Sequence, residues 1–110
     1  MRAVVLTEFG EPDVLRITEV PVPTPAADEI LVRVHATSLN RADLLQRRGF
    51  YPNPFPGDYD IPGMEFAGEV VATQAATSAP AAPARFKPGD RVMGIVSGGA
   101  YAEYVVIPSA

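Results

Sequence analysis

Apolar and polar side chains alternate along several short stretches of the chain, which is the pattern of half-buried β-strands. The alternation is clearest over residues 29–38, where one face carries only apolar side chains: Ile30, Val32, Val34 and Ala36. Weaker alternation over residues 14–22 sets Leu15, Ile17 and Val20 against polar neighbours. The strands predicted in this way cover residues 3–6, 14–22, 29–38, 65–73, 91–96 and, after a turn at Gly98 and Gly99, 100–108.

Residues 41–48 follow a helical pattern instead. Leu44 and Leu45 lie there among residues of high helix propensity. Asn40 can cap the N-terminus, and Asp43 falls in the first turn, where the helix dipole favours a carboxylate. The expected stop signals follow at the other end: Arg47, Arg48 and Gly49. The sequence therefore predicts one short helix.

Twelve prolines and nine glycines break the rest of the chain into turns and loops. Residues 50–63, rich in Pro, Gly, Asn and Tyr, predict a long loop of the kind that often carries function. Residues 75–85, mostly Ala, Ser, Thr and Pro, predict a low-complexity surface loop. Short strands joined by turns, with one short helix, predict a mainly β fold arranged as a partly open β-barrel.

Composition narrows the classes of function. The 110 residues suit a single domain, and a hydrophobic fraction of 47% is enough for a core. The net charge is −4 and the arginines are scattered, so the clustered positive face of a nucleic-acid-binding protein is not expected. The chain has no cysteine and only one histidine, His35, which argues against disulfides and against a metal site.

The N-terminus gives no sign of a membrane or a secretory route. Its apolar run turns polar at Thr7 and Glu8, too early for a signal peptide or a membrane span. The expected location is therefore cytoplasmic, with no membrane partner.

Four stretches in this order and spacing resemble a known family: SLNRADLLQRRGFYP, IPGMEFAGEVV, FKPGDRVMG and GGAYAEYVVIP. They resemble the N-terminal domain of medium-chain dehydrogenases/reductases, most closely the zinc-free NADPH quinone oxidoreductases. The resemblance covers residues 1–110 apart from the Ala/Pro tract, which looks like an insertion. It implies a GroES-like β-barrel that is followed, in the family, by a Rossmann domain across an active-site cleft.

The Rossmann domain is not expected within this chain. No G-x-G-x-x-G stands on a strand-to-helix turn, so the fingerprint that binds a dinucleotide pyrophosphate is missing. We therefore expect the 110 residues to be a fragment of a longer enzyme, inactive alone. The resemblance also implies that the full-length parent forms a homodimer.

Within the resemblance, two metal ligands are replaced. In the zinc-dependent branch the position of Asn40 is a cysteine ligand and that of Met64 a histidine ligand. Neither thiolate nor imidazole is present here, so the resemblance implies no zinc. The implied reaction is hydride transfer from NADPH to an electrophile that needs no metal, a quinone or an enone. We expect Glu65, which follows Met64, to pair with a basic group.

The resemblance also implies the site residues. Asn40 and Tyr51 are the implied catalytic residues, and Asn40, Tyr51 and Arg41 the implied cofactor contacts. Asn40 would orient either the substrate carbonyl or the nicotinamide amide, although it can equally serve only as a helix cap. Tyr51 would offer a flat apolar face and one polar tip, or simply pack on the barrel. Arg41 would approach the cofactor pyrophosphate, or be solvated.

The other polar and aromatic candidates have simpler expected roles. Asp43 is expected to serve the helix N-terminus or a nearby arginine. His35 has no partner motif and is expected to be structural or exposed. Tyr59 and Phe55 are expected to pack in the loop, although they could extend the wall of the substrate cleft.

Two functions of other classes remain open at this stage. A GroES-like barrel of this length could be a co-chaperonin, although that function needs a mobile, Gly-rich apolar loop early in the chain. A reductase domain that has lost its partner domain could also serve as a non-catalytic interaction module.

Overall fold

The computed structural model describes residues 1–54, 57–73 and 85–109. The described residues form six strands, one α-helix and one short 3-10 helix, so the mainly β prediction is confirmed. In chain order these are β1 (Arg2–Leu6), η1 (Pro12–Val14), β2 (Leu15–Glu19), β3 (Glu29–Thr37), α1 (Arg41–Arg47), β4 (Glu65–Thr73), β5 (Arg91–Ile95) and β6 (Tyr104–Pro108). Of the predicted loop at residues 75–85, all but Arg85 lies outside the described residues.

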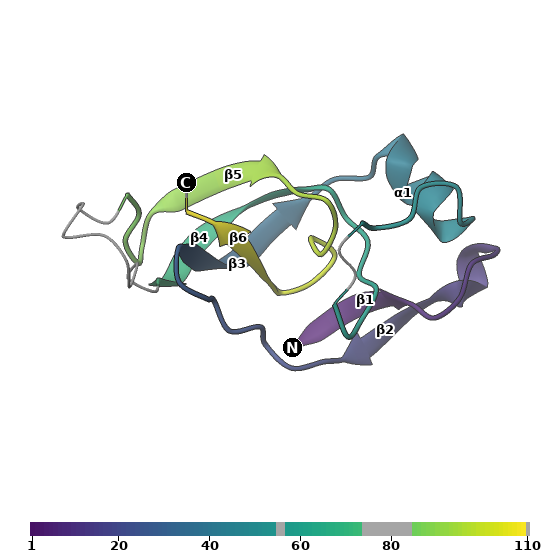
Figure 1. Cartoon of the computed structure of the whole chain (residues 1–110), viewed down its shortest axis with the longest axis horizontal. Helices are drawn as coiled ribbons and strands as arrows, with labels where there is room; N and C mark the ends of the chain where they lie inside the picture. The colour runs from purple at the N-terminus through teal and green to yellow at the C-terminus, as the bar shows by residue number, and fades with distance from the viewer. Residues whose placement is uncertain (55–56, 74–84, 110) are drawn as a thin grey trace.

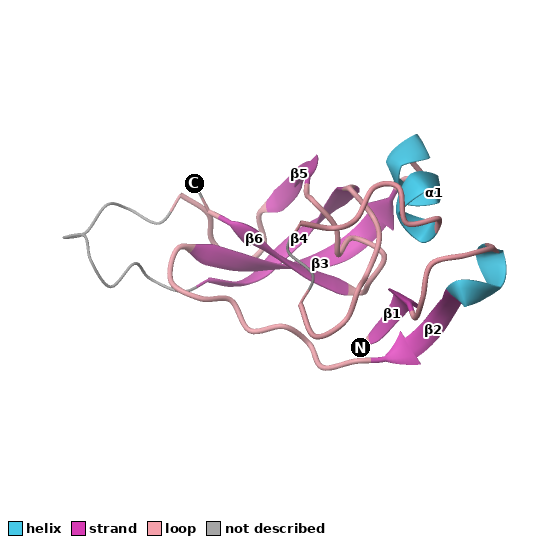
Figure 2. Cartoon of the chain, turned by 45° about the vertical axis from the view of Figure 1, so that its right-hand side comes forward, coloured by secondary structure: helices cyan, strands magenta, loops and turns pink. Residues whose placement is uncertain are grey.

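The strands form two antiparallel sheets, seen in Figure 1. The larger has the order β5-β4-β3-β6, and β1 pairs with β2 in the smaller one. Neither sheet closes on itself among the described strands, which agrees with a partly open barrel. Figures 1 and 2 both show α1 just beyond the end of β3, at the same end of the molecule as η1.

The core of the larger sheet follows from the alternation in β3. Ile30 and Val32 are buried, as the sequence predicts, and they pack with Phe66 and Val70 of β4 and with Val105 of β6. β-branched and aromatic side chains suit this packing because they fit the pleated surface of a sheet. β3 therefore forms the centre of the fold, hydrogen-bonded to β4 on one side and β6 on the other.

The prediction for residues 14–22 was wrong in two respects. Residues 12–14 form a 3-10 turn, and β2 covers only Leu15–Glu19. Ile17 pairs with Val4 on the face away from buried Ala3, and 78% of it is exposed. A two-stranded sheet can cover only one of its faces with a small core, so alternation alone did not identify the buried side.

The last predicted strand was too long, because only Tyr104–Pro108 pairs in a ladder. The stretch before it bonds to two different segments. The Tyr101 carbonyl oxygen accepts from the Val4 N–H at 2.8 Å, and the Tyr101 N–H donates to the Pro62 carbonyl oxygen at 2.9 Å. Residues 100–102 therefore tie the two sheets and the loop after α1 together instead of extending β6.

Candidate functional site

Three polar side chains meet where β3 ends, α1 begins and β4 starts. The Ser38 hydroxyl donates to Glu65 Oε2, and the Asn40 amide Nδ2 donates to the same oxygen at 2.8 Å. Asn40 Nδ2 also donates to Ser38 Oγ at 3.2 Å. We call these three residues the Ser38–Asn40–Glu65 cluster. All three residues are half-buried, so the cluster lies at the surface of the fold.

The cluster holds Glu65 as a carboxylate. The hydrogen bond from Ser38, and after it the one from Asn40, lowers the pKa of Glu65 from its ordinary value, while partial burial opposes them. The expected basic partner of Glu65 was wrong, because its hydrogen-bond partners are these two neutral donors. The only signal for them in the sequence was the need of such a carboxylate for some partner.

A second carboxylate, that of Asp43, holds the N-terminus of α1. The Asn40 N–H donates to the Asp43 side chain, at Oδ2, at 2.8 Å, as in a capping box, and the Asp43 N–H also donates to the Asn40 carbonyl oxygen at 3.0 Å. The prediction that Asp43 serves the helix N-terminus is thus confirmed. The residue is only 7% exposed, and its other oxygen, Oδ1, has no partner among the described residues.

Tyr101 supplies the other hydrogen bond to Asp43. Its hydroxyl lies 2.6 Å from Asp43 Oδ2 and 3.2 Å from the Ser38 carbonyl oxygen. Burial, together with the hydrogen bond to the Asp43 carboxylate, raises the pKa of Tyr101 well above its ordinary value. The sequence did not predict this role, since Tyr101 lies 58 positions from Asp43 and only the fold brings the two together.

Gly63 makes room for Tyr101. Its φ of +105° lies in the region that glycine tolerates, and a β-carbon there would be 2.6 Å from both Cδ1 and the backbone N of Tyr101. The loop can therefore hydrogen-bond to residues 100 and 101 only with glycine at this position.

The buried face of α1 fixes the helix against the rest of the domain. Gln46 Nε2 donates to Asp60 Oδ1 at 3.0 Å, and Arg47 Nη1 donates to the Gly10 carbonyl oxygen at 2.6 Å. Arg47 was expected only as a cation in the last helical turn. It is instead buried, and it ties α1 to the loop before η1.

The structure does not bring the three predicted site residues into hydrogen-bond contact with one another. Asn40 belongs to the cluster described above. Arg41 is exposed, and neither it nor Tyr51, which is 46% exposed, has a hydrogen-bond or ion-pair partner among the described residues. Tyr59 is also exposed at 43%, and Phe55 lies outside the described residues.

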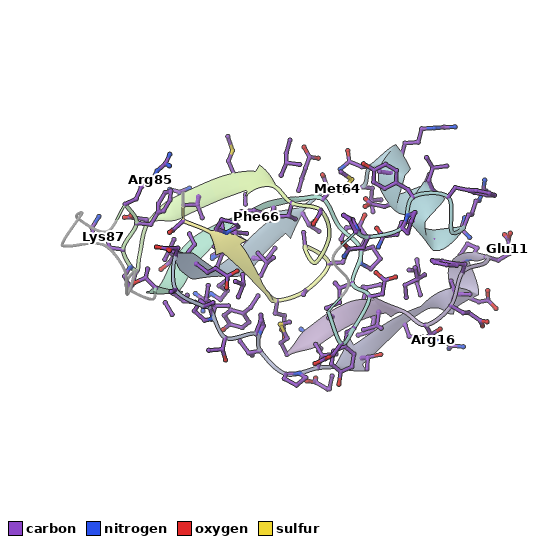
Figure 3. All side chains as sticks on the ribbon, viewed as in Figure 1. Glu11, Arg16, Met64, Phe66, Arg85 and Lys87 are labelled. Carbon is purple, nitrogen blue, oxygen red and sulfur yellow. The ribbon has the colours of Figure 1, made fainter. Side chains whose placement is uncertain are left out.

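Met64 directly precedes Glu65, which is a member of the cluster and the first residue of β4. In the view of Figure 3, Met64 lies toward the end of the molecule that carries α1, whereas Phe66, two residues further, lies over the larger sheet. The Met64 carbonyl oxygen accepts from the Val96 N–H at 2.6 Å, which fixes the backbone at the start of β4. In the described part of the chain, no three side chains of the His, Cys, Asp and Glu types are grouped so that they could hold a metal ion.

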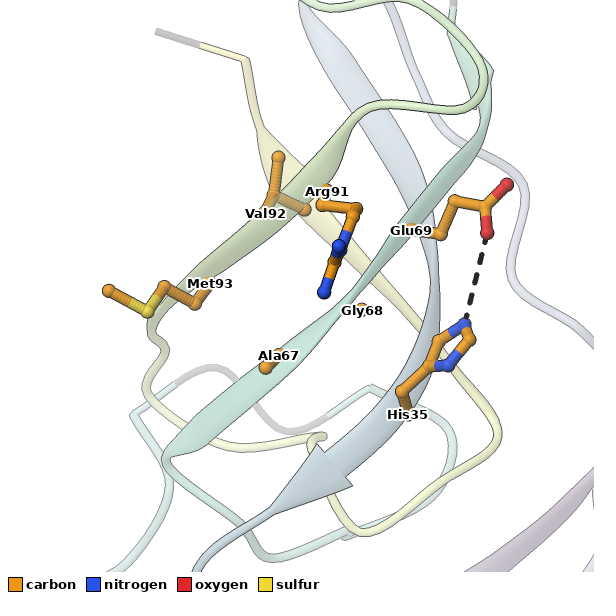
Figure 4. Close-up of a pocket in the computed structure, with 7 residues that line it drawn as sticks. All are labelled: His35, Ala67, Gly68, Glu69, Arg91, Val92 and Met93. Carbon is orange, nitrogen blue, oxygen red and sulfur yellow. Dashed lines mark ion pairs between the residues drawn. The ribbon is translucent and has the colours of Figure 1, made fainter.

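His35 lies on the outer face of the larger sheet, away from the cluster. Its side chain is 55% exposed, as predicted, with Nε2 4.0 Å from Glu69 Oε2 (Figure 4). An ion pair at this distance and exposure is worth little. With Arg91 and Met93 these residues line a shallow hollow of about 580 Å³. Nothing in it converges on one point as a binding site would require.

Comparison with known proteins agrees with this architecture. Residues 26–110 match the model of the alcohol dehydrogenase GroES-like domain. A chloroplastic quinone-oxidoreductase homolog of Spinacia oleracea is 40% identical over an alignment of 104 positions, which covers 88% of this chain and 29% of that protein. No helix among the described residues is long and apolar enough to cross a membrane.

Solved structures of larger proteins contain the same fold. The human synaptic vesicle membrane protein VAT-1 homolog-like protein matches with a TM-score of 0.81 and 38% identity, over 98% of this chain and 33% of that one. The quinone oxidoreductase of Thermus thermophilus, whose complex with NADPH is also known, matches with a TM-score of 0.73 and 33% identity, over 99% and 30%. The chain thus spans about a third or less of the length of these proteins.

Proposed function

The chain belongs to the family of alcohol dehydrogenase GroES-like domains, and from this premise we propose that it is the substrate-side domain of an oxidoreductase. The proposed reaction of the whole enzyme is metal-free hydride transfer from NADPH to a quinone or an enone. The named quinone oxidoreductases among its relatives support the substrate class, and the relative with a known NADPH complex supports the cofactor. The cytoplasmic location and the homodimeric parent remain predictions.

The proposal that the reaction needs no metal rests on the chemistry of the possible metal ligands at the start of α1 and just before β4. An amide at Asn40 and a thioether at Met64 are poor ligands for Zn²⁺, which prefers thiolate, imidazole and carboxylate. The carboxylate that follows Met64, that of Glu65, already accepts hydrogen bonds from Ser38 and Asn40. These residues do not fit a catalytic zinc site, so no step of the proposed reaction uses a metal.

The residues present do fit the nicotinamide end of a cofactor. Asn40 offers an amide that the cluster holds in place, and Tyr51 and Arg41 offer a phenol and a guanidinium with no partner in the described part of the chain. A nicotinamide cofactor supplies the hydride when it is bound. The role of these residues is to hold the reactants in a productive geometry, which accounts for much of the rate in such a reaction.

Each residue has a distinct proposed role. Asn40 holds one reactant by its amide. Tyr51 stacks its ring on the quinone or the nicotinamide and donates its hydroxyl to a substrate oxygen. Arg41 lies where it can meet a phosphate of the cofactor, because its guanidinium is exposed at the first turn of α1.

The test is binding of 1,2-naphthoquinone to the 15N-labelled chain, followed by NMR. We expect shifts at Asn40, Arg41 and Tyr51, and loss of binding in Tyr51→Ala but not in the control Tyr59→Ala. We expect no oxidation of NADPH when it is added with the quinone, because much of the cofactor site would belong to another domain. Turnover by the chain alone, quinone shifts confined to other surfaces, or a heptameric ring in sedimentation would contradict the proposal.

A further inference from the structure

We propose that the free edge of β5 is an interaction surface, and that its partner is the same edge of a second copy of this chain. The two β5 strands pair antiparallel about a two-fold axis at Met93, so that two larger sheets join into one. This association does not rest on the proposed function, because it needs only the fold and the exposed groups of β5.

The strand edges of the fold differ in how well they are protected from such pairing. The two sheets end in β1, β2, β5 and β6. The outer edge of β1 is already used, since the Val4 N–H donates to the Tyr101 carbonyl oxygen. β2 carries the charged residues Arg16 and Glu19, and β6 ends in Pro108, which has no N–H to donate. β5 has one charged residue, at its first position, and is otherwise apolar or glycine, so it is the least protected edge among the described strands.

The backbone of β5 presents unpaired groups along this edge. β5 and β4 are antiparallel, and the Val96 N–H donates to the Met64 carbonyl oxygen, so these two residues form a hydrogen-bonded pair. In an antiparallel ladder, such pairs alternate with residues whose N–H and C=O point away from the neighbouring strand. In β5 the residues that point away from β4 are therefore Arg91, Met93 and Ile95. No described residue is bonded to their outward N–H and C=O groups.

The side chains of this edge add apolar surface to the unpaired backbone. Met93 is 83% exposed and Ile95 75% exposed. Figure 4 shows the Met93 side chain extending away from Ala67 of the neighbouring strand. Removing these two side chains from water is favourable, and a strand that pairs with β5 also satisfies the outward N–H and C=O groups.

The sequence of β5 is self-complementary, which favours a second copy over an unrelated strand. With the two-fold axis at Met93, this residue lies opposite itself and Arg91 lies opposite the partner's Ile95, so like charges do not meet. The aliphatic part of Arg91 can then lie along an apolar side chain. The axis also pairs outward residues only with outward residues, so each outward N–H of one copy meets a carbonyl oxygen of the other.

The first test is sedimentation equilibrium of the chain over a range from about 1 µM to about 1 mM. Because the strand has only five residues, the interface is small, and we expect a weak dimer whose average mass rises with concentration from 11.7 kDa toward twice that value. Met93→Lys sets two ammonium groups against each other at the axis and should weaken the dimer about tenfold or more. The control Ile17→Lys, at a site 78% exposed on β2, should leave the dimer unchanged.

A second pair of variants tests the register. Ile95→Glu places a carboxylate opposite the partner's Arg91, whereas Ile95→Glu combined with Arg91→Glu places two carboxylates opposite each other. The single variant should therefore dimerise about tenfold or more tightly than the double variant. In the 15N-labelled chain, the backbone resonances of Met93 and Ile95 should shift with concentration.

Three results would overturn the proposal. The first is a monomer at all concentrations. The second is a dimer that Met93→Lys leaves unchanged or that Ile17→Lys weakens equally, and the third is equal dimerisation of the two register variants. Concentration-dependent shifts confined to β2 or β6 would likewise place the contact on another edge and refute the assignment to β5.

Discussion

Replacement of Tyr101 by phenylalanine tests the link between the loop and the start of α1. Phenylalanine keeps the ring, so no cavity opens and only the hydroxyl is lost. The Asp43 carboxylate, 7% exposed, would then keep one hydrogen-bond donor, the Asn40 N–H, and its Oδ1 is already without a partner among the described residues. A hydrogen bond to a charged group contributes about 1.5–3 kcal/mol, so we expect the variant to lose about 2 kcal/mol.

The assay is urea unfolding followed by circular dichroism, with a thermal scan alongside. A loss of about 2 kcal/mol should lower the melting temperature by roughly 8 °C in a domain of this size, with an unchanged denaturant slope. Tyr59→Phe is the control, since that side chain is 43% exposed and its hydroxyl has no partner among the described residues. The control should stay within about 0.5 kcal/mol of the wild type.

A second signature appears at alkaline pH. The pKa of Tyr101 is raised in the fold, so the fold favours the protonated phenol. The stability that this provides is fully present below about pH 10, the ordinary pKa of tyrosine, and is lost as the pH rises above that value. The difference between the ultraviolet titration curves of the wild type and of Tyr101→Phe should show one phenol that ionises at a higher pH than an ordinary tyrosine. Equal stability of Tyr101→Phe and its control, or ordinary ionisation near pH 10, would refute the reasoning.

Two further substitutions test the packing, each against a matched control. Gly63→Ala should lower the free energy of unfolding by well over about 2 kcal/mol, since its β-carbon would lie 2.6 Å from Tyr101. The control Gly89→Ala, with φ +96° but open space around it, should lose only about 1–2 kcal/mol from its backbone conformation. Similar losses at both sites in urea unfolding would contradict the steric argument. Ile30→Ala, at 1% exposure, should lose about 2–5 kcal/mol, and the same change at Ile17, at 78% exposure, within about 0.5 kcal/mol. A large loss at Ile17 would show that its face of β2 is covered in solution.

The sequence predicted most accurately the strands that pair with a neighbouring strand on each side, β3 and β4. The bounds of β4 agree with the prediction at both ends, and those of β3 and α1 to within one residue at the C-terminal end. In β3 the alternation is reinforced by neighbours on either side, so local pattern and tertiary packing select the same face. Near Ile17 and Tyr101, the buried face and the extent of the strand depend on which distant segment packs there. Local alternation carries no information about that segment.

The candidate site likewise combines partners that are close in sequence, which could be predicted, with partners that are remote, which could not. Asn40 and Asp43 are three positions apart, so a helix-capping pattern was enough to place them together. The partners that complete the site are remote in sequence: Glu65 lies 25 positions from Asn40, and Tyr101 58 positions from Asp43. Sequence reasoning asked for a partner for each carboxylate but had no means of choosing a serine and an amide over an arginine. That choice is made by the antiparallel pairing of β3 with β4, which sets Thr37 opposite Phe66.

The arrangement of donors also decides how experiments on Asn40 should be read. The Asn40 backbone caps α1, and the Asn40 amide donates a hydrogen bond to the Glu65 carboxylate. Any substitution of Asn40 therefore alters stability and site geometry together. Lost activity in an Asn40 variant would therefore not identify a ligand contact. Ser38 separates the two effects, because it bonds to the cluster without belonging to the helix. If Asn40 is only a structural cap, changing Ser38 affects stability alone; if its amide must be held in one orientation, changing Ser38 also affects what binds there.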